Sequence, residues 1–492
     1  MKRLSAAIAP AQKRVVKVLQ FGEGNFLRAF VDYMLDIANE NAVFDGGVVI
    51  IKPIAYGSLD RFEEQNCRYT VLLRGIEDGK LVETSRLITC VEDAVDCYTD
   101  YEKYAAFAAL DSLRFIVSNT TEAGIVLDEE DRFDYTPPHS YPGKLTKFLY
   151  ERAEAFHYDP KKGLIVLPVE LIDDNGVVLR QCVHALAKRW ELGGRFIKWL
   201  DDACIFTSTL VDRIVTGYPR DEAEAIWKKL GYEDQLLDTA EPFGLWVIES
   251  QKDIQSEFPL DACGLPVIFT DNQKPYKQRK VRILNGAHTS FVPAAYLCGH
   301  DLVKQAMADP LIKQFILDTL HQEVIPTLTL PKADLDAFAD AVIGRFENPF
   351  IHHRLLSISL NSVSKWRARC MPSFLAYIDQ YGSLPAHLTF SLAALMALYQ
   401  GHEIKDGALM CKRDGVPYQI LDGEAVLTFF LNNAKLSAQE QTVLFLQNEA
   451  FWGQNLSAIP GLTQTVSRAF EDIKQNGMKQ ALAERFCGNT KI

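Results

Sequence analysis

Val15-Val16-Lys17-Val18-Leu19-Gln20-Phe21-Gly22-Glu23-Gly24-Asn25-Phe26 is the stretch that decides the fold of the N-terminal half. Residues 15–20 are mostly apolar, which is typical of a buried strand. Two glycines follow, and a helix-like pattern then runs to Asn39. A strand, a glycine turn and a helix open a dinucleotide-binding unit. We therefore expect a Rossmann-like α/β domain built around this segment.

The two glycines of this turn have different roles in such a unit. Gly22 can adopt the tight turn, and Gly24 lets the backbone approach a pyrophosphate at the helix N-terminus. The third glycine of G-x-G-x-x-G is absent, since Leu27 stands there, and G-x-G alone occurs in many loops. We expect the cofactor to bind along the whole turn, at Phe21, Gly22, Glu23, Gly24, Asn25, Phe26, Leu27 and Arg28.

The second predicted strand, residues 47–52, ends in Lys52. An acidic residue at this position would bind a ribose hydroxyl and favour NAD. Lys52 either favours the 2′-phosphate of NADP or is an ordinary residue at the end of a strand. These residues therefore leave the choice between NAD and NADP open.

Polar residues also follow a core strand at residues 114–118, in the order Asn119-Thr120-Thr121-Glu122-Ala123-Gly124. In open α/β sheets, nucleotides bind at the carboxyl ends of parallel strands. The alternative is a hydrogen-bonded turn without a ligand. We expect Asn119 and Thr120 to contact the cofactor.

The C-terminal half has a different pattern, because helical periodicity dominates from about residue 275 to residue 485. We place the boundary after residue 268, which gives a Rossmann-like domain at 1–268 and a mostly α-helical domain at 269–492. Residues 406–418 are a polar interruption that we interpret as a surface loop.

The helical half begins with Lys280-Val281-Arg282-Ile283-Leu284-Asn285-Gly286-Ala287-His288, which carries an amine, an amide and an imidazole. On an α-helix, Asn285 and His288 fall about 140° and 80° around the axis from Lys280. A buried lysine can shuttle a proton, an amide can donate to a developing oxyanion, and a histidine can orient either partner. The alternative is a surface lysine, a helix-bending Asn-Gly pair and a core histidine.

Composition limits the other classes of function. The chain has 492 residues, 48% hydrophobic and 24% charged, with a net charge of −12, which argues against nucleic-acid or anionic-membrane binding. The ten cysteines form no C-x-x-C pair, so we expect free thiols in the cytoplasm. No run is long enough for a membrane helix, and the histidines show no zinc spacing. We expect a metal-free mechanism, and the oligomeric state stays open.

The K-x-R-x-x-N-G-x-H pattern at residues 280–288 resembles the catalytic helix of the mannitol dehydrogenase family, the metal-independent long-chain polyol and sugar-acid dehydrogenases. The resemblance runs from about residue 15 to the C-terminus and points to the tagaturonate reductase branch. The other matching segments are residues 20–30, 118–124, 210–219, 238–241 and 344–349.

The resemblance implies an NAD-dependent reduction of D-tagaturonate to D-altronate, in a cleft between the two domains. Lys280 would donate the proton, Asn285 and Asn175 would stabilise the developing negative oxygen, and His288 would orient substrate or lysine. Family members place a carbonyl-polarising asparagine after the strand at residues 163–168, and we carry that role to Asn175. The alternative for Asn175 is a plain Asn-Gly turn.

Three further residues are candidates for substrate binding. Asp212 would hold the active lysine, or form a structural pair with Arg213. Lys277, one helical turn before Lys280, would bind the substrate carboxylate, as would Arg367 or Lys365; the alternative is a solvated basic patch. The rival functions are a fructuronate (mannonate) reductase, a mannitol-type dehydrogenase, and a nucleotide-binding sensor without catalysis.

Overall fold

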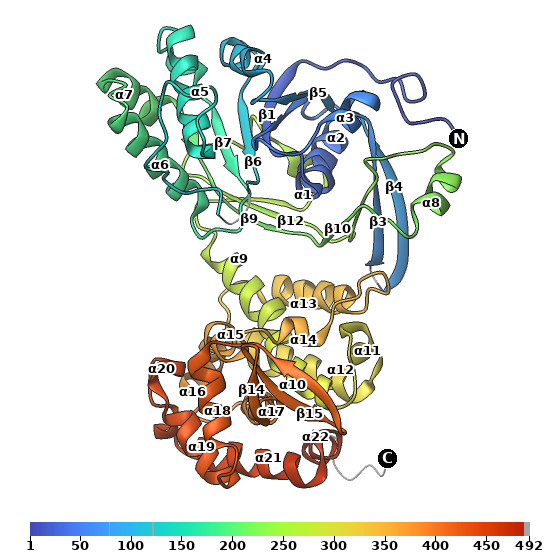
Figure 1. The fold of residues 1–492 in the computed structure, drawn as a ribbon, viewed down its shortest axis with the longest axis vertical. Helices are drawn as coiled ribbons and strands as arrows, with labels where there is room; N and C mark the ends of the chain where they lie inside the picture. The colour runs from blue at the N-terminus through green and yellow to red at the C-terminus, as the bar shows by residue number, and fades with distance from the viewer. Residues whose placement is uncertain (78, 121–122, 487–492) are drawn as a thin grey trace. The chain divides into compact units, whose positions relative to one another are not determined.

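The parallel sheet predicted around residues 15–20 lies at the centre of the N-terminal unit in the computed structural model, which describes residues 1–77, 79–120 and 123–486 (Figure 1). Its six strands are all parallel. In spatial order they are β5 (Val91–Asp96), β2 (Gly47–Lys52), β1 (Val16–Phe21), β6 (Phe115–Ser118), β7 (Ile165–Pro168) and β8 (Ile205–Phe206). The strand order reverses between β1 and β6, and ligands of such sheets bind beyond the carboxyl ends of the strands at this point.

The two faces of this sheet are buried under different layers, because successive side chains of a strand point to opposite sides. Val18 lies in one hydrophobic cluster, and Leu19 and Phe21 lie in the other. Helices cover the second face: α4 (Tyr101–Ala106), α5 (Tyr141–Ala155), α6 (Asn175–Arg189) and α7 (Gly194–Ala203). The Rossmann-like prediction for this half of the chain is confirmed.

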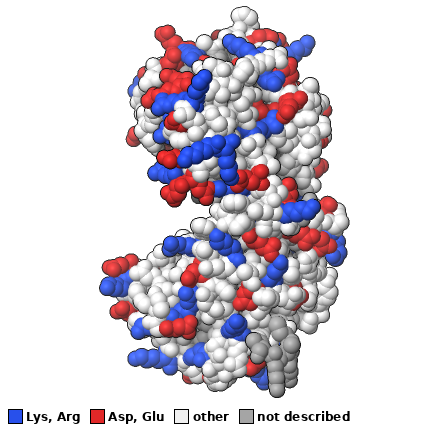
Figure 2. Space-filling view, turned by 90° about the vertical axis from the view of Figure 1, so that its right-hand side faces the viewer, with Lys and Arg blue, Asp and Glu red and all other residues white. Residues whose placement is uncertain are grey.

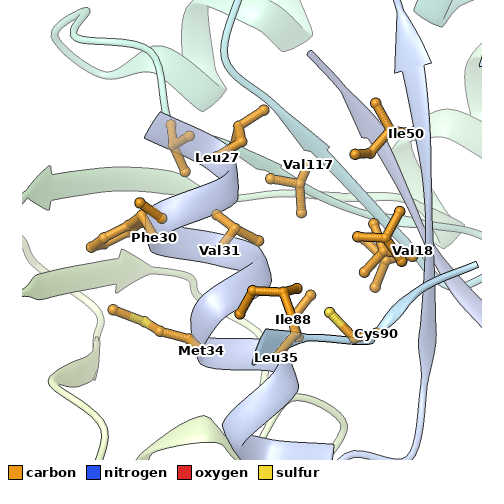
Figure 3. Packing of buried hydrophobic residues seen from close by; sticks show 14 of the residues in the cluster. Val18, Leu27, Phe30, Val31, Met34, Leu35, Ile50, Ile88, Cys90 and Val117 are labelled. Atoms are coloured by element: carbon orange, nitrogen blue, oxygen red, sulfur yellow. The ribbon is translucent and has the colours of Figure 1, made fainter. Parts of the chain in front are cut away.

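The first face is covered by the helix that follows the glycine turn. It is built from α1 (Asn25–Leu27), a π-helical turn η1 (Arg28–Asp32) and α2 (Tyr33–Glu40). Figure 3 shows its apolar side chains packed against strand residues Val18, Ile50 and Val117. All are nearly fully buried, so the helix that positions the turn is held by a dense core.

Two smaller sheets complete the N-terminal unit. One has the order β10 (Val215–Gly217), β11 (Asp238–Ala240), β3 (Tyr69–Glu77) and β4 (Lys80–Ile88). The other has the order β13 (Val267–Thr270), β12 (Leu245–Glu249) and β9 (Ser208–Asp212). In the sequence, helix α3 (Asp60–Glu64) precedes β3, and helix α8 (Ala223–Leu230) lies between β10 and β11.

The chain divides into two compact units, Met1–Gln273 and Lys274–Ile492. The boundary that the sequence suggested, after residue 268, lies inside β13. The second unit is mostly helical, as expected. Its helices are α9 (Lys274–Arg279), η5 (Lys280–Asn285), α10 (Gly286–Leu297), α11 (Val303–Ala308), α12 (Pro310–Asp318), η6 (Thr319–Val324), α13 (Lys332–Phe346), α14 (Leu355–Ile358), α15 (Ser362–Arg369), α16 (Met371–Tyr381), α17 (Ala386–Leu398), α18 (Glu424–Asn433), α19 (Ala438–Gln447), α20 (Glu449–Trp452), α21 (Leu462–Asn476) and α22 (Met478–Phe486).

The surface loop predicted at residues 406–418 is wrong. This region forms an antiparallel sheet of β14 (Gly401–Lys405), β15 (Ala408–Arg413) and β16 (Val416–Ile420). Asp406-Gly407 and Asp414-Gly415 form its two turns, and all four residues have positive φ. Asp-Gly pairs are typical of hairpin turns, so these two dipeptides could have predicted the hairpins. The polarity of the segment led to the prediction of a loop instead.

The surface carries both signs of charge. Acidic and basic side chains are interspersed on the face shown in Figure 2. Nine of the ten cysteines lie in the described residues and are free thiols, while Cys487 lies outside them. No helix within the described ranges combines the length and the apolar character that a membrane span needs.

Candidate active site

The glycine turn is fixed at the switch point of the sheet by its two neighbouring strands. The Gly22 N–H donates to Ile51 O (2.9 Å), and the Asn119 N–H donates to Phe21 O (3.1 Å). Gly22 has φ +126°, and a Cβ there would lie 3.0 Å from Leu27 Cδ1 and 3.1 Å from Asn119 O. Only glycine fits this position without strain.

Gly24 differs from Gly22, because nothing in the described part of the chain requires a glycine there. Its φ is −67°, and no heavy atom lies within 4 Å of a Cβ built on it. Gly24 and Asn25 are exposed at the start of the helix, where backbone N–H groups favour an anion. The surface at Gly24 is therefore open to a phosphate that approaches the backbone.

Leu27 and Arg28, both in the predicted cofactor set, face the interior. Leu27 stands at the third-glycine position and packs in the core against Gly22. Arg28 is buried, donates to Asn25 Oδ1 and Leu236 O, and lies 3.5 Å from Asp238 Oδ2. The Arg28 guanidinium contacts the turn from the interior of the domain. The groups that the turn exposes are therefore mainly backbone.

Lys52, which left the choice between NAD and NADP open, is neutralised within the protein. Its side chain has no exposed surface, and its Nζ lies 3.0 Å from Asp96 Oδ2. The same nitrogen donates to Ile54 O at 2.6 Å and to Tyr56 O at 3.3 Å. Glu23 is close to this pair: burial raises the Glu23 pKa and the charge of Lys52 opposes the rise. The end of β2 thus presents no uncompensated cation.

Glu170, which follows β7, is a site residue that the sequence analysis missed. It is almost fully buried, and its carboxylate accepts from Ser118 Oγ at 3.1 Å and from the Thr120 N–H and Oγ1 at 3.0 Å each. Burial raises its pKa, and these donors oppose the rise. Glu170 therefore fixes the loop after β6 that carries Asn119 and Thr120. Thr121 and Glu122 of the predicted segment lie outside the described residues.

Asn175, expected to polarise the substrate carbonyl, is fully buried at the start of α6. Its Nδ2 lies 3.0–3.2 Å from the carbonyl oxygens of Pro168, Glu170 and Thr209. Its Oδ1 accepts from the Gly176 and Thr209 N–H groups, both at 2.9 Å. Every polar atom of this side chain is engaged with backbone, which leaves no donor for a substrate oxygen.

Asp212 is the last residue of β9, and its side chain is nearly fully buried. Arg213, its suggested structural partner, donates instead to the carbonyl oxygens of Ala29 (2.8 Å), Phe243 (2.9 Å) and Pro242 (3.1 Å). Arg213 therefore ties the end of β9 to the helix after the glycine turn.

In the second unit, the K-x-R-x-x-N-G-x-H segment is not the continuous α-helix that we expected. Residues Lys280–Asn285 form a π-helix between α9 and α10. Its i→i+5 hydrogen bonding stacks residues five apart, so Lys280 and Asn285 share a face more closely than in an α-helix. Both are half-buried, and the Asn285 carboxamide bonds to no side chain or backbone group of the described residues. The π turn thus places Lys280 and Asn285 on one face, and the described residues leave the donors of the Asn285 carboxamide unused.

His288 lies one turn into α10 and is enclosed by aromatic rings and cations. Its ring centroid lies 4.2 Å from that of Phe346 and 5.4 Å from that of His353. Nε2 is buried without a hydrogen-bond partner among the described residues. Burial, followed by the charges of His353, Arg345, Arg369 and Lys365, lowers the His288 pKa well below its usual value. His288 is therefore a neutral imidazole in a basic environment.

The predicted carboxylate-binding residues lie in different places. Lys277 is half-buried in α9, one turn before the π-helix. Lys365 is half-buried in α15 and its charge reaches His288. Arg367 is exposed two residues further on, against Gly453, where an added Cβ would collide with its guanidinium. The structure therefore associates Lys365 with His288 and puts Arg367 on another face of α15.

Two protein-family models match the chain. The mannitol dehydrogenase Rossmann domain matches residues 16–262, and the mannitol dehydrogenase C-terminal domain matches residues 272–474. This chain belongs to the mannitol dehydrogenase family. It is therefore an oxidoreductase that acts on CH–OH groups, a polyol or sugar-acid dehydrogenase.

Relatives within the mannitol dehydrogenase family match the chain over its full length. An altronate oxidoreductase of Yersinia enterocolitica is 44% identical over 490 residues, which is 98% of this chain and 99% of the relative. An altronate oxidoreductase of Escherichia coli is 43% identical over 489 residues, with the same two shares.

Two solved structures share the fold of this chain. A D-sorbitol dehydrogenase in substrate-free form has a TM-score of 0.81 and 22% identity, covering 98% of this chain and 100% of its own. Mannitol 2-dehydrogenase of Pseudomonas fluorescens, in a ternary complex with NAD and D-mannitol, has a TM-score of 0.66 and 20% identity, covering 99% and 100%. The two-part α/β and helical architecture is thus that of the mannitol dehydrogenase family.

One group of potential metal ligands occurs in the described part of the chain: Asp128, Asp131 and His139. The Asp131 carboxylate already accepts from the His139 N–H, the Ser140 N–H and the Ser140 hydroxyl. These bonds hold Ser140, whose hydroxyl caps α5 by accepting from the Gly143 N–H, so Asp131 has a structural role without an ion.

Proposed function

We propose that this protein reduces D-tagaturonate to D-altronate with NADH and catalyses the reverse oxidation with NAD⁺. The observation that carries the proposal is the similarity to altronate oxidoreductases, which extends over almost the whole of both chains. Nine described cysteines are free thiols, which supports a reducing compartment such as the cytoplasm.

The residues at the switch point of the sheet fit a dinucleotide. Gly22 makes the tight turn, Gly24 leaves its backbone open, and Glu170 holds the adjacent Ser118–Thr120 strand end. Lys52 is neutralised by Asp96, so no free cation at this strand end would favour a 2′-phosphate. This supports NAD over NADP. When bound, the nicotinamide ring supplies or accepts the hydride.

The π-helix supplies the groups for proton transfer in this proposal. Lys280 donates a proton to the alkoxide that forms from the substrate ketone, and removes it again in the oxidation. The Asn285 carboxamide donates to the same oxygen as its negative charge develops. Neutral His288, whose buried Nε2 has no hydrogen-bond partner within the described ranges, positions a substrate hydroxyl.

The charges around this helix support a sugar acid as substrate. The rings of His353 and His288 lie 5.4 Å apart, centroid to centroid. Burial lowers the His288 pKa, and the charges of Arg369 and Lys365 lower it further. A neutral polyol would leave these charges uncompensated, whereas a hexuronate carries a carboxylate at the far end from its ketone.

The proposal is tested by following NADH oxidation with D-tagaturonate, D-fructuronate and D-fructose. We expect D-tagaturonate to have the highest kcat/KM and NADPH to be a poorer reductant than NADH. Preference for fructuronate would identify a mannonate-forming reductase, and preference for fructose a mannitol-type enzyme. Binding of NADH without turnover of any of the three would identify a nucleotide-binding sensor.

A further inference from the structure

Helix α15 presents two cations to the catalytic helix from one face. Lys365 and Arg369 are four residues apart, which places them on the same side of an α-helix. Arg367 lies between them and points elsewhere, toward Gly453. The helical phase therefore places Lys365 and Arg369, whose charges act on His288, on one face of α15 and Arg367 on another.

The end of α15 is packed directly against the start of α10. A Cβ on Gly286 would lie 3.3 Å from Arg369 O, and Cys370 Sγ lies 3.5 Å from Gly286 O. Gly286 is the residue after Asn285. The backbone of Arg369 is thus fixed one residue away from the carboxamide assigned to the developing oxyanion.

The Arg369 guanidinium is half-buried, yet it makes no hydrogen bond or ion pair with any residue of the described ranges. Lys365 donates from Nζ to Ile358 O at 2.9 Å and has no carboxylate within ion-pair distance among those residues. The charge of Asp422 reaches Lys365, but Asp422 Oδ2 already accepts from Tyr399 Oη at 2.6 Å. Two partly buried cations without an anion among these residues are unfavourable, and a bound anion would compensate their charge.

We propose that Arg369, with Lys365 beside it, binds the carboxylate of the sugar-acid substrate and determines the preference for uronates over neutral ketoses. This inference rests on the proposed function, and it moves carboxylate recognition from Arg367 to Arg369. A guanidinium can bind both carboxylate oxygens in a fork, and its backbone anchor at Gly286 would hold the far end of the substrate in register with Lys280 and Asn285. Arg369 acts on binding and orientation.

The first test compares turnover by the full chain with D-tagaturonate and with D-fructose. Arg369→Leu is expected to raise KM for tagaturonate by about 10²-fold or more, with a much smaller change for fructose. Arg369→Lys should restore part of the loss, because it keeps the charge without the fork. Arg468→Leu removes an exposed arginine from α21 and serves as the control. A selective loss in Arg367→Leu, with Arg369→Leu unaffected, would overturn the inference.

The second test measures equilibrium binding by calorimetry, which separates carboxylate binding by Arg369 from the reaction. We call this binding the carboxylate clamp. D-altronate and the neutral polyol D-altritol are titrated into the NADH-bound protein, in which no hydride transfer can follow. Arg369→Leu should lose altronate affinity and keep altritol affinity. Arg369-dependent altronate binding without tagaturonate turnover would retain the clamp and reject the proposed function. Tagaturonate turnover with unchanged altronate affinity in Arg369→Leu would reject the clamp and retain the function.

Discussion

The rings of His288 and His353 lie 5.4 Å apart, centroid to centroid, and are nearly perpendicular at 78°. Burial lowers the pKa of both, and the charge of His353 lowers that of His288 further. Below the unfolded-state value of about 6.5, the unfolded chain therefore binds more protons than the folded chain. Stability from this pair is complete above that pH and is lost as the pH falls.

His353→Gln should make thermal unfolding less sensitive to acid, because glutamine stays neutral. We expect the unfolding midpoint of the unmodified protein to fall more steeply between pH 7.5 and pH 5 than that of the variant. Exposed His402→Gln is the matched control and should follow the unmodified protein. Parallel curves for all three proteins would show that the His288–His353 pair does not couple protonation to folding.

Asp32, in the helix after the glycine turn, predicts the opposite pH trend. Its Oδ2 accepts from Tyr69 Oη at 2.6 Å, its Oδ1 has no partner among the described residues, and burial raises its pKa from 3.8 to about 7. The folded state therefore holds the proton more tightly, and stability from this group is lost as the pH rises from about 4 to 7.

Asp32→Asn should consequently gain stability relative to the unmodified protein as the pH rises, by an amount on the order of 4 kcal/mol between pH 4 and pH 8. The measurement is the free energy of unfolding in denaturant across that range. Asp45→Asn removes an exposed carboxylate and serves as the control. A pH-independent difference between Asp32→Asn and the unmodified protein would show that the Asp32 pKa is the same in the folded and the unfolded chain.

The two glycines of the turn give a matched pair of variants. Gly22→Ala places a Cβ at φ +126° in contact with Leu27 and Asn119, so it should cost about 1–3 kcal/mol of stability and also weaken NADH binding. Gly24→Ala meets no atom of the described residues, so it should leave the unfolding midpoint unchanged and reduce NADH affinity alone, measured by fluorescence titration. Unaltered NADH affinity in Gly24→Ala would place the cofactor phosphates elsewhere.

The strand, turn and helix at residues 15–40 could be predicted because their signal is local. A short apolar run followed by two glycines at fixed offsets specifies the same geometry in any such unit. The role of Asn175 could not be predicted in this way. Whether its carboxamide is free depends on the backbone of Thr209, thirty-four residues further along the chain.

In the C-terminal site, the sequence could not predict which face of its helix each residue occupies. The residues of 280–285 suit an α-helix equally well, since a π turn differs only in which carbonyl each N–H reaches. Arg367 and Arg369 are equivalent in composition, and only the packing of α15 against Gly286 distinguishes them. Glu170 was missed because a buried acid after an apolar strand has no sequence signature of its own.

Lys280→Ala should lower kcat by a factor of about 10² to 10⁴, the usual contribution of a general acid. NADH affinity should not change, because in this proposal Lys280 acts on the substrate oxygen. Exposed Lys435→Ala controls for the loss of one positive charge. Steady-state kinetics with NADH saturating would make the comparison, and an undiminished kcat in Lys280→Ala would remove the proposed proton donor.

Asn175 and Asn285 should respond to truncation in opposite ways. Asn175→Ala leaves two backbone N–H groups and three carbonyl oxygens without their buried partner, so we expect a loss of roughly 3 kcal/mol or more of stability. Asn285→Ala removes a carboxamide with no described partner, so its folding should be unaffected while kcat falls by about 10²- to 10³-fold. Unfolding midpoints and kcat for D-tagaturonate, measured on both variants, assign each asparagine to structure or to chemistry. A stable but inactive Asn175→Ala would return that residue to the carbonyl-polarising role that the family resemblance suggested.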